Sequence, residues 1–139
     1  MENHNIAIVG LGRVGTAFLK KALTSDCVMT VKAVCEMCDT PGKELADKEE
    51  IPIVELNEIV GLGVGVDVIF DLAGDKNVSQ ILHQKLAQSG NTYTDVAPIR
   101  VSRLIWGLIA GDEYLPDLGK CKNQIYADML IEQSAKPEL

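Results

Sequence analysis

A glycine-rich turn between a short apolar run and an amphipathic segment constrains this chain more than any other feature. The run Asn5-Ile6-Ala7-Ile8-Val9 has the composition of a buried strand, and Gly10-Leu11-Gly12-Arg13-Val14-Gly15 follows it directly. Apolar residues then recur at helical spacing over residues 14–23. The residues of this helix that we expect to face inward are Val14, Ala17, Phe18, Ala22 and Leu23. The sequence therefore predicts a strand, a tight turn and a helix, in that order.

Each glycine of the turn has a separate physical role. Gly10 allows the chain to turn sharply off the strand, and Gly12 has no Cβ, so that a pyrophosphate can approach the backbone. Gly15 allows the helix to lie close to the strand, and the N–H groups at the helix N-terminus attract phosphate. In this strand–turn–helix context the pattern Gly-x-Gly-x-x-Gly predicts a dinucleotide-binding loop. A tight turn without a ligand is the alternative.

Length and composition predict a single domain. The chain has 139 residues, of which 47% are hydrophobic, and its mean hydropathy is +0.11. We expect one domain over residues 1–139, with its core at about residues 5–110 and a helical tail at about residues 111–139.

The charge of the chain limits its partners. A formal net charge of −7 argues against nucleic acid and against anionic membranes. No apolar run approaches the length that spans a bilayer, and the N-terminus lacks the basic start of a signal peptide. We therefore expect a cytoplasmic protein.

Segments typical of strands and helices alternate along the chain. Further strands are predicted over residues 28–35, 51–54, 66–72 and 92–96, and further helices over residues 40–50, 57–60, 77–89, 101–109 and 123–134. This alternation predicts an α/β fold with a parallel sheet and helices on both faces. The second glycine cluster, Gly61-Leu62-Gly63-Val64-Gly65, precedes a strand, so we expect it to form a flexible turn.

The residues just after the strands define the expected binding edge, because ligands bind beyond the carboxyl ends of parallel strands. Glu36 follows the second strand about 20 residues after Gly15, where a carboxylate can accept hydrogen bonds from both ribose hydroxyls of an adenosine. It would repel a 2′-phosphate, which favours NAD over NADP. Asp39 is a second candidate, and Arg13 could contact a phosphate. The alternative for Glu36 is a solvated loop acid.

Small residues follow the fourth strand and would let the backbone pass close to the nicotinamide side of a dinucleotide. Asp75 or Asn77 has the alternative role of capping the next helix. The candidate cofactor-binding residues are Gly10, Leu11, Gly12, Arg13, Val14, Gly15, Glu36, Met37, Ala73, Gly74 and Asp75. Ala97-Pro98 follows the fifth strand and offers no hydride-transfer partner, so no catalytic residue is identified.

Two cysteines form a C-x-x-C sequence at Cys35 and Cys38, and Cys27 and Cys121 lie elsewhere. The two histidines of the chain do not supply the spacing of a zinc site, so we expect no metal. A thioredoxin-like pair opens a helix, whereas here the helix begins only after Cys38, at Thr40-Pro41. We expect reduced, structural cysteines, with redox sensing as the alternative.

The segment Ile6–Val96 resembles the N-terminal cofactor domain of NAD(P)-dependent dehydrogenases of the homoserine and aspartate dehydrogenase type and of the Gfo/Idh/MocA oxidoreductases. The resemblance is carried by Gly10-x-Gly12-x-x-Gly15, by Glu36 and by the run from Val66 to Gly74. It implies a three-layer Rossmann-type fold and an NAD cofactor.

Those enzymes carry a second, catalytic domain, for which this sequence shows no counterpart. We therefore expect a stand-alone NAD(H)-binding module with a regulatory or sensing role, acting through a partner protein or its own homodimer. An oxidoreductase cofactor subunit completed by another chain is the main alternative. A degenerate loop that binds a CoA-like nucleotide is a third.

Two predicted helices are apolar over much of their surface, one around residues 104–109 and one around residues 125–131. They either cover the sheet or form a two-fold interface, and Trp106 is the expected centre of such an interface.

Overall fold

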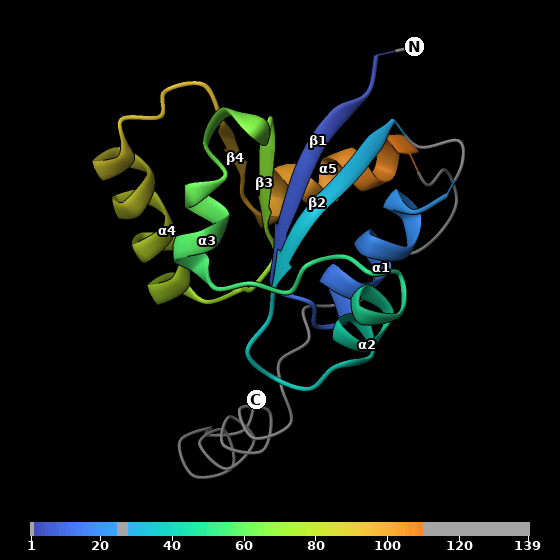
Figure 1. The fold of residues 1–139 in the computed structure, drawn as a ribbon. Helices are drawn as coiled ribbons and strands as arrows, with labels where there is room; N and C mark the ends of the chain where they lie inside the picture. Colours follow the sequence, from blue (N-terminus) through green and yellow to red (C-terminus); the bar gives the residue numbers. More distant parts are fainter. Residues whose placement is uncertain (1, 25–27, 110–139) are drawn as a thin grey trace, which may run out of the picture.

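The computed structural model describes residues 2–24 and 28–109, over which strands and helices alternate (Figure 1). In chain order the elements are β1 (His4–Val9), α1 (Arg13–Ala22), β2 (Met29–Cys35), α2 (Pro41–Lys48), α3 (Leu56–Gly61), the 3-10 helix η1 (Gly63–Gly65), β3 (Val68–Asp71), α4 (Lys76–Ser89), β4 (Asp95–Ala97) and α5 (Ile99–Ile109). The predicted helix over residues 123–134 and the expected tail over residues 111–139 lie outside the described residues.

The four strands form one parallel sheet in the order β2-β1-β3-β4, as the alternation predicts. β1 is central and pairs with β2 on one side and with β3 on the other. The chain passes from β1 outward to β2 and then returns to the other side of β1. The direction of travel along the sheet therefore reverses between β1 and β3, which is the position where α/β sheets bind ligands.

Helices cover both faces of the sheet, which confirms the expected three layers (Figure 1). Ile6 and Ile8 of β1 belong to a core with residues of α1, α2 and α5. Ala7 and Val9 belong to a second core with residues of α3 and α4. Successive residues of a strand point to opposite faces, so a central strand that is apolar throughout requires cover on both.

Polar side chains fix where two of the helices begin. The hydroxyl of Thr40 accepts a hydrogen bond from the N–H of Lys43 at 3.1 Å, and Pro41 occupies the first turn of α2. The carboxylate of Asp75 accepts one from the N–H of Asn77 at 2.8 Å. Of the two predicted caps of α4, Asp75 is therefore the one that forms.

The strand predicted over residues 51–54 is wrong in extent. Only a single parallel bridge forms there, between Val34 and Ile53. The N–H of Val34 donates to the carbonyl of Pro52 at 2.9 Å, and the N–H of Val54 donates to the carbonyl of Val34 at 2.8 Å. Pro52 has no N–H to add to the ladder, which limits the segment to this contact beside β2.

The third and fourth strands of the sheet begin later than the sequence predicts, because local turns occupy their first N–H groups. The N–H of Val66 bonds to the carbonyl of Gly63, which closes η1 where a flexible turn was expected. The side-chain oxygen of Asn91 accepts from the N–H groups of Tyr93 and Thr94, at 2.9 and 3.2 Å. The fifth helix, by contrast, begins earlier than predicted, directly after Pro98.

Trp106 faces inward, so the expectation that it centres an interface is wrong. Its side chain is 6% exposed, and its ring lies 5.9 Å from that of Phe18 in the core between α1 and the sheet. Among the side chains of α5 that the structure describes, the exposed large apolar ones are Val101, Leu104 and Leu108.

Candidate functional site

The fold itself requires glycine at two positions of the turn between β1 and α1. Gly10 has φ +99°, and a Cβ on it would lie 2.6 Å from the backbone of Ala73. A Cβ on Gly15 would lie 1.8 Å from the carbonyl oxygen of Gly10. The turn is therefore pressed between the first turn of α1 and the loop that follows β3.

Gly12 differs from the other two glycines of the turn, because residues other than glycine also adopt its φ of −75°. It is the N-cap of α1 and has no side chain that could bond to the first N–H groups of the helix. The first N–H groups of a helix have no partner within it, and the helix dipole is positive there. No acidic side chain lies in this first turn, and Arg13 is exposed at its start. The arrangement suits an anion.

Glu36 is fixed beside the glycine turn. Its Oε1 accepts a hydrogen bond from the N–H of Leu11 at 2.6 Å, and its Oε2 accepts one from the N–H of Cys38 at 3.0 Å. The side chain is half-buried, so Glu36 is not a freely solvated loop acid. A carboxylate offers about four acceptor positions, so these two bonds leave capacity for hydroxyl donors. Asp39, the second candidate, is exposed.

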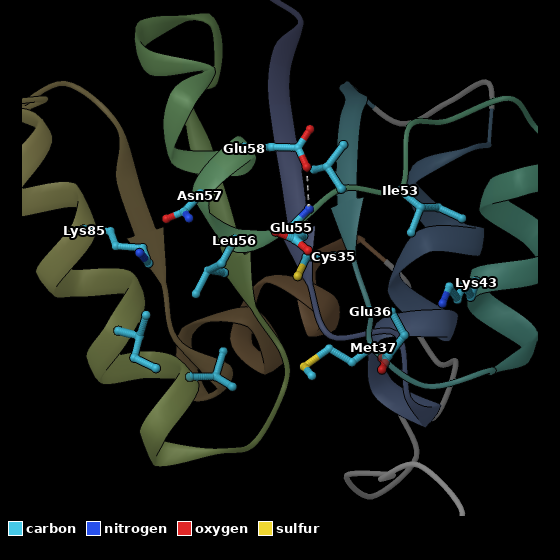
Figure 2. Close-up of a pocket in the computed structure, with 13 residues that line it drawn as sticks. Cys35, Glu36, Met37, Lys43, Ile53, Glu55, Leu56, Asn57, Glu58 and Lys85 are labelled. Carbon is cyan, nitrogen blue, oxygen red and sulfur yellow. Dashed lines mark hydrogen bonds between the residues drawn. The ribbon is translucent and has the colours of Figure 1, made fainter.

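A cavity of about 660 Å³ opens beside Glu36, between the end of β2 and helices α3 and α4 (Figure 2). Apolar side chains on its walls come from Met37, Leu56, Val78 and Ile81. Met37 is 90% exposed, although it is a large apolar residue. Both the volume and the mixture of apolar walls with a few charged groups are typical of sites for small organic ligands.

The remaining residues predicted to bind the cofactor differ in whether their side chains are buried or can reach a ligand. The side chains of Leu11 and Val14 are buried in the core, so they can meet a ligand only through their backbone. Ala73 is half-buried, and Gly74 is exposed with φ +69°. Asp75 has its cap role, and it also lies at the edge of a second cavity.

Asp71, the last residue of β3, is a buried acid that the sequence did not predict as a site residue, and it is 4% exposed. The hydroxyl of Ser79 on α4 donates to its Oδ2, whereas Oδ1 is buried without a hydrogen-bond partner among the described residues. Asp71 lines the second cavity, of about 390 Å³, together with Gly74, Lys76 and Pro98. An acid inside the apolar run of β3 is the sequence signal that could have found it.

The cysteines near the site are not a dithiol pair. Cys35 is a free thiol, whereas Cys38 is disulfide-bonded, contrary to the expectation that it is reduced. Nothing in the C-x-x-C spacing explains why Cys38 forms a disulfide while Cys35 does not. Burial, followed by the charges of Glu36 and Glu55, raises the pKa of the Cys35 thiol. Cys35 is therefore protonated at neutral pH and a poor nucleophile.

Neither metal ligands nor membrane spans are found in the part of the chain that the structure describes. Within residues 2–24 and 28–109, no group of three or more His, Cys, Asp or Glu side chains could hold a metal ion. No helix in these ranges has the length and apolar composition to cross a membrane.

Comparison with known proteins identifies the fold. No protein-family model and no curated protein sequence matches the chain. Among solved structures, homoserine dehydrogenase of S. aureus aligns with a TM-score of 0.51 at 17% identity, over 79% of this chain and 30% of that one. RSP, solved in complex with β-NAD⁺ and operator DNA, aligns with a TM-score of 0.49 at 8% identity, over 99% of this chain and 64% of that one.

The chain thus spans less than two thirds of either protein. The similarity to homoserine dehydrogenase, together with the strand order, confirms the Rossmann-type fold. At this identity it shows the fold alone.

Proposed function

We propose that the chain binds a nicotinamide adenine dinucleotide across the carboxyl edge of its sheet, as a module with a regulatory or sensing role. The observation that carries the proposal is the contact between Glu36 and the glycine turn, through the N–H of Leu11. It brings a carboxylate and a helix N-terminus to the point where the strand order reverses. These are the two groups that recognise ribose and pyrophosphate.

The adenosine half belongs to the larger cavity. Its ribose would donate hydrogen bonds to the acceptor positions of Glu36 that the backbone leaves open. The apolar walls at Val78 and Ile81, and the exposed side chain of Met37, suit a flat aromatic base. The pyrophosphate would lie at Gly12, with Arg13 beside it. The charge of Glu36 opposes a 2′-phosphate, so NAD(H) is the expected cofactor.

The partners that we propose are the dinucleotide and a protein, either a second copy of this chain or another chain. A formal net charge of −7 opposes association with nucleic acid. The regulatory role would then be exerted through that protein contact.

The second candidate function is an oxidoreductase cofactor subunit, which the structural similarity to homoserine dehydrogenase favours. An assay for turnover of a substrate distinguishes the two functions. A dehydrogenase would convert homoserine or a related hydroxy acid with change of nicotinamide absorbance, alone or with its partner chain. A sensing module would bind the dinucleotide without consuming it.

Calorimetric titration with NAD⁺, NADH, NADP⁺ and NADPH tests the binding. Gly12→Val should abolish it, because a side chain at the N-cap occupies the space that the pyrophosphate needs. Gly65→Val is the matched control, since a Cβ there meets nothing within 4 Å. Unchanged binding by a folded Gly12→Val variant would rule out the glycine turn as the phosphate site. Failure of the wild-type protein to bind any of the four would refute the proposed function.

A further inference from the structure

The second cavity holds a carboxylate that the proposed adenosine and pyrophosphate contacts do not use. Asp71 keeps one hydrogen bond, from Ser79, and its Oδ1 is enclosed without a partner among the described residues. An unpaired buried charge is costly, and such groups in native proteins require an explanation. A structural role explains Oδ2 but leaves Oδ1 unexplained.

The charges around this cavity are negative on balance. Asp71 and Asp75 are acidic, Lys76 is basic, and the other lining residues are uncharged. Lys76 is exposed, so water screens its charge, whereas Asp71 is enclosed by the sheet and α4. A charge in such a low-dielectric wall acts more strongly on a neighbouring ligand than a charge in water. The cavity therefore favours a positively charged group.

The order of the strands places this cavity on the far side of the glycine turn from Glu36. Glu36 follows β2, the glycine turn follows β1, and Asp71 ends β3, in the order β2-β1-β3-β4. A dinucleotide whose adenosine lies at Glu36 and whose pyrophosphate lies at Gly12 extends its other half toward β3 and β4. That half carries the nicotinamide ring, which is positively charged when oxidised and neutral when reduced.

We propose that the Asp71 carboxylate makes this site prefer NAD⁺ to NADH, so that the site reports the redox state of the cofactor. The preference rests on the proposed function, because the dinucleotide must first bind across the sheet edge. The carboxylate acts through its charge on the ring and takes no part in a chemical step.

Titration of the full chain with NAD⁺, NADH and ADP-ribose, which lacks the ring, tests this role. We expect NAD⁺ to bind about tenfold more tightly than NADH to the wild-type protein. Asp71→Asn has the same shape and can keep a hydrogen bond with Ser79, but it removes the charge. The two affinities should then agree within about threefold, while ADP-ribose binds as before. Asp95→Asn is the control, because it removes one negative charge from an exposed residue at the start of β4, at the amino edge of the sheet. This variant should keep the wild-type ratio of NAD⁺ to NADH affinity.

The outcomes separate this role from the proposed function. Binding of ADP-ribose with equal affinities for NAD⁺ and NADH would overturn the role of Asp71 and leave the proposed function in place. A preference that persists in Asp71→Asn would overturn it too. Absence of binding for all three ligands would overturn both. Should Asp71→Asn fail to fold, Ser79→Ala keeps the charge without the hydrogen bond, and loss of the preference in that variant would count against the carboxylate.

Discussion

An aspartate lies at each end of β3, Asp67 just before the strand and Asp71 as its last residue, and the two have different hydrogen-bond partners. At the amino edge, Asp67 accepts hydrogen bonds from the N–H of Asn5 at 2.8 Å and from the hydroxyl of Tyr93, and His4 lies 3.9 Å away. At the carboxyl edge, Asp71 accepts one hydrogen bond through Oδ2, and its Oδ1 has no partner within residues 2–24 and 28–109. The amino edge is closed by bonds of the protein to itself, whereas the carboxyl edge keeps a buried carboxylate whose charge can act on a ligand in the cavity that Asp71 lines.

The largest difference between the two edges is expected in the unfolding free energy that a glycine substitution costs. Gly10→Ala, at the carboxyl edge, should cost about 3 kcal/mol or more of unfolding free energy, since φ is +99° and the new Cβ would clash with the backbone of Ala73. Gly65→Ala, just before β3, should change it by less than about 0.5 kcal/mol, since nothing lies within 4 Å of its Cβ position. Urea unfolding measures both. Equal losses would show that the two edges are equally tolerant.

A smaller change in free energy is expected at Glu36, and it concerns the binding of NAD⁺. Glu36 also bonds to the glycine turn, so its loss can affect the structure of the site as well. Glu36→Ala should weaken NAD⁺ binding by about tenfold or more, since charged hydrogen bonds to ribose are lost. NADP⁺ binding should fall less, because the charge that opposes the 2′-phosphate is removed as well. Calorimetry with both cofactors measures the two losses.

Two further variants control for a loosened glycine turn. Glu36→Gln keeps an acceptor for the N–H of Leu11 while removing the charge, and Glu49→Ala removes an exposed charge elsewhere. Equal losses of NAD⁺ and NADP⁺ in Glu36→Ala would take the ribose role away from Glu36.

The smallest effect is expected at the amino edge and depends on pH. The hydrogen bond from Tyr93, then that from Asn5, and the nearby His4 hold the pKa of Asp67 below its ordinary value of 3.8. Because the folded-state pKa is lowered, the stabilisation is present above the ordinary value and is lost as pH falls through the folded-state pKa.

Asp67→Asn should therefore lose less stability between about pH 7 and about pH 3 than the wild-type protein does. Urea midpoints at the two pH values measure this difference. An identical acid dependence in both proteins would mean that Asp67 does not couple protonation to folding.

Much of the fold could be predicted from sequence because it depends on neighbouring residues. The apolar run of β1 and the start of α2 at Thr40-Pro41 are local features, and the structure has both. The errors arose where local and distant interactions compete. Asn91 delays β4 through a turn of its own, and Pro52 limits the edge segment to one bridge.

The candidate site could be predicted only in part. Spacing along the sequence is enough to predict Glu36 and the glycines as site residues. It does not predict the hydrogen bond between Glu36 and the N–H of Leu11. Asp71 could not be predicted because its burial, and the lack of a partner for its Oδ1 in the described part of the chain, depend on the assembled sheet and on α4. Trp106 was misplaced for a related reason: its orientation depends on contact with Phe18, which lies on another helix.

The sequence by itself determined that this chain alternates strands and helices, that its sheet is parallel and that a glycine turn opens its first helix. Periodicity, caps and turns encode these features within a few neighbouring residues. Only the tertiary structure decided that the Glu36 carboxylate bonds to the turn, which described acid has an unpartnered oxygen and which large side chains are buried. Those outcomes require strands distant in sequence to align side by side, and the packing of helices on the sheet then fixes the surroundings of each side chain.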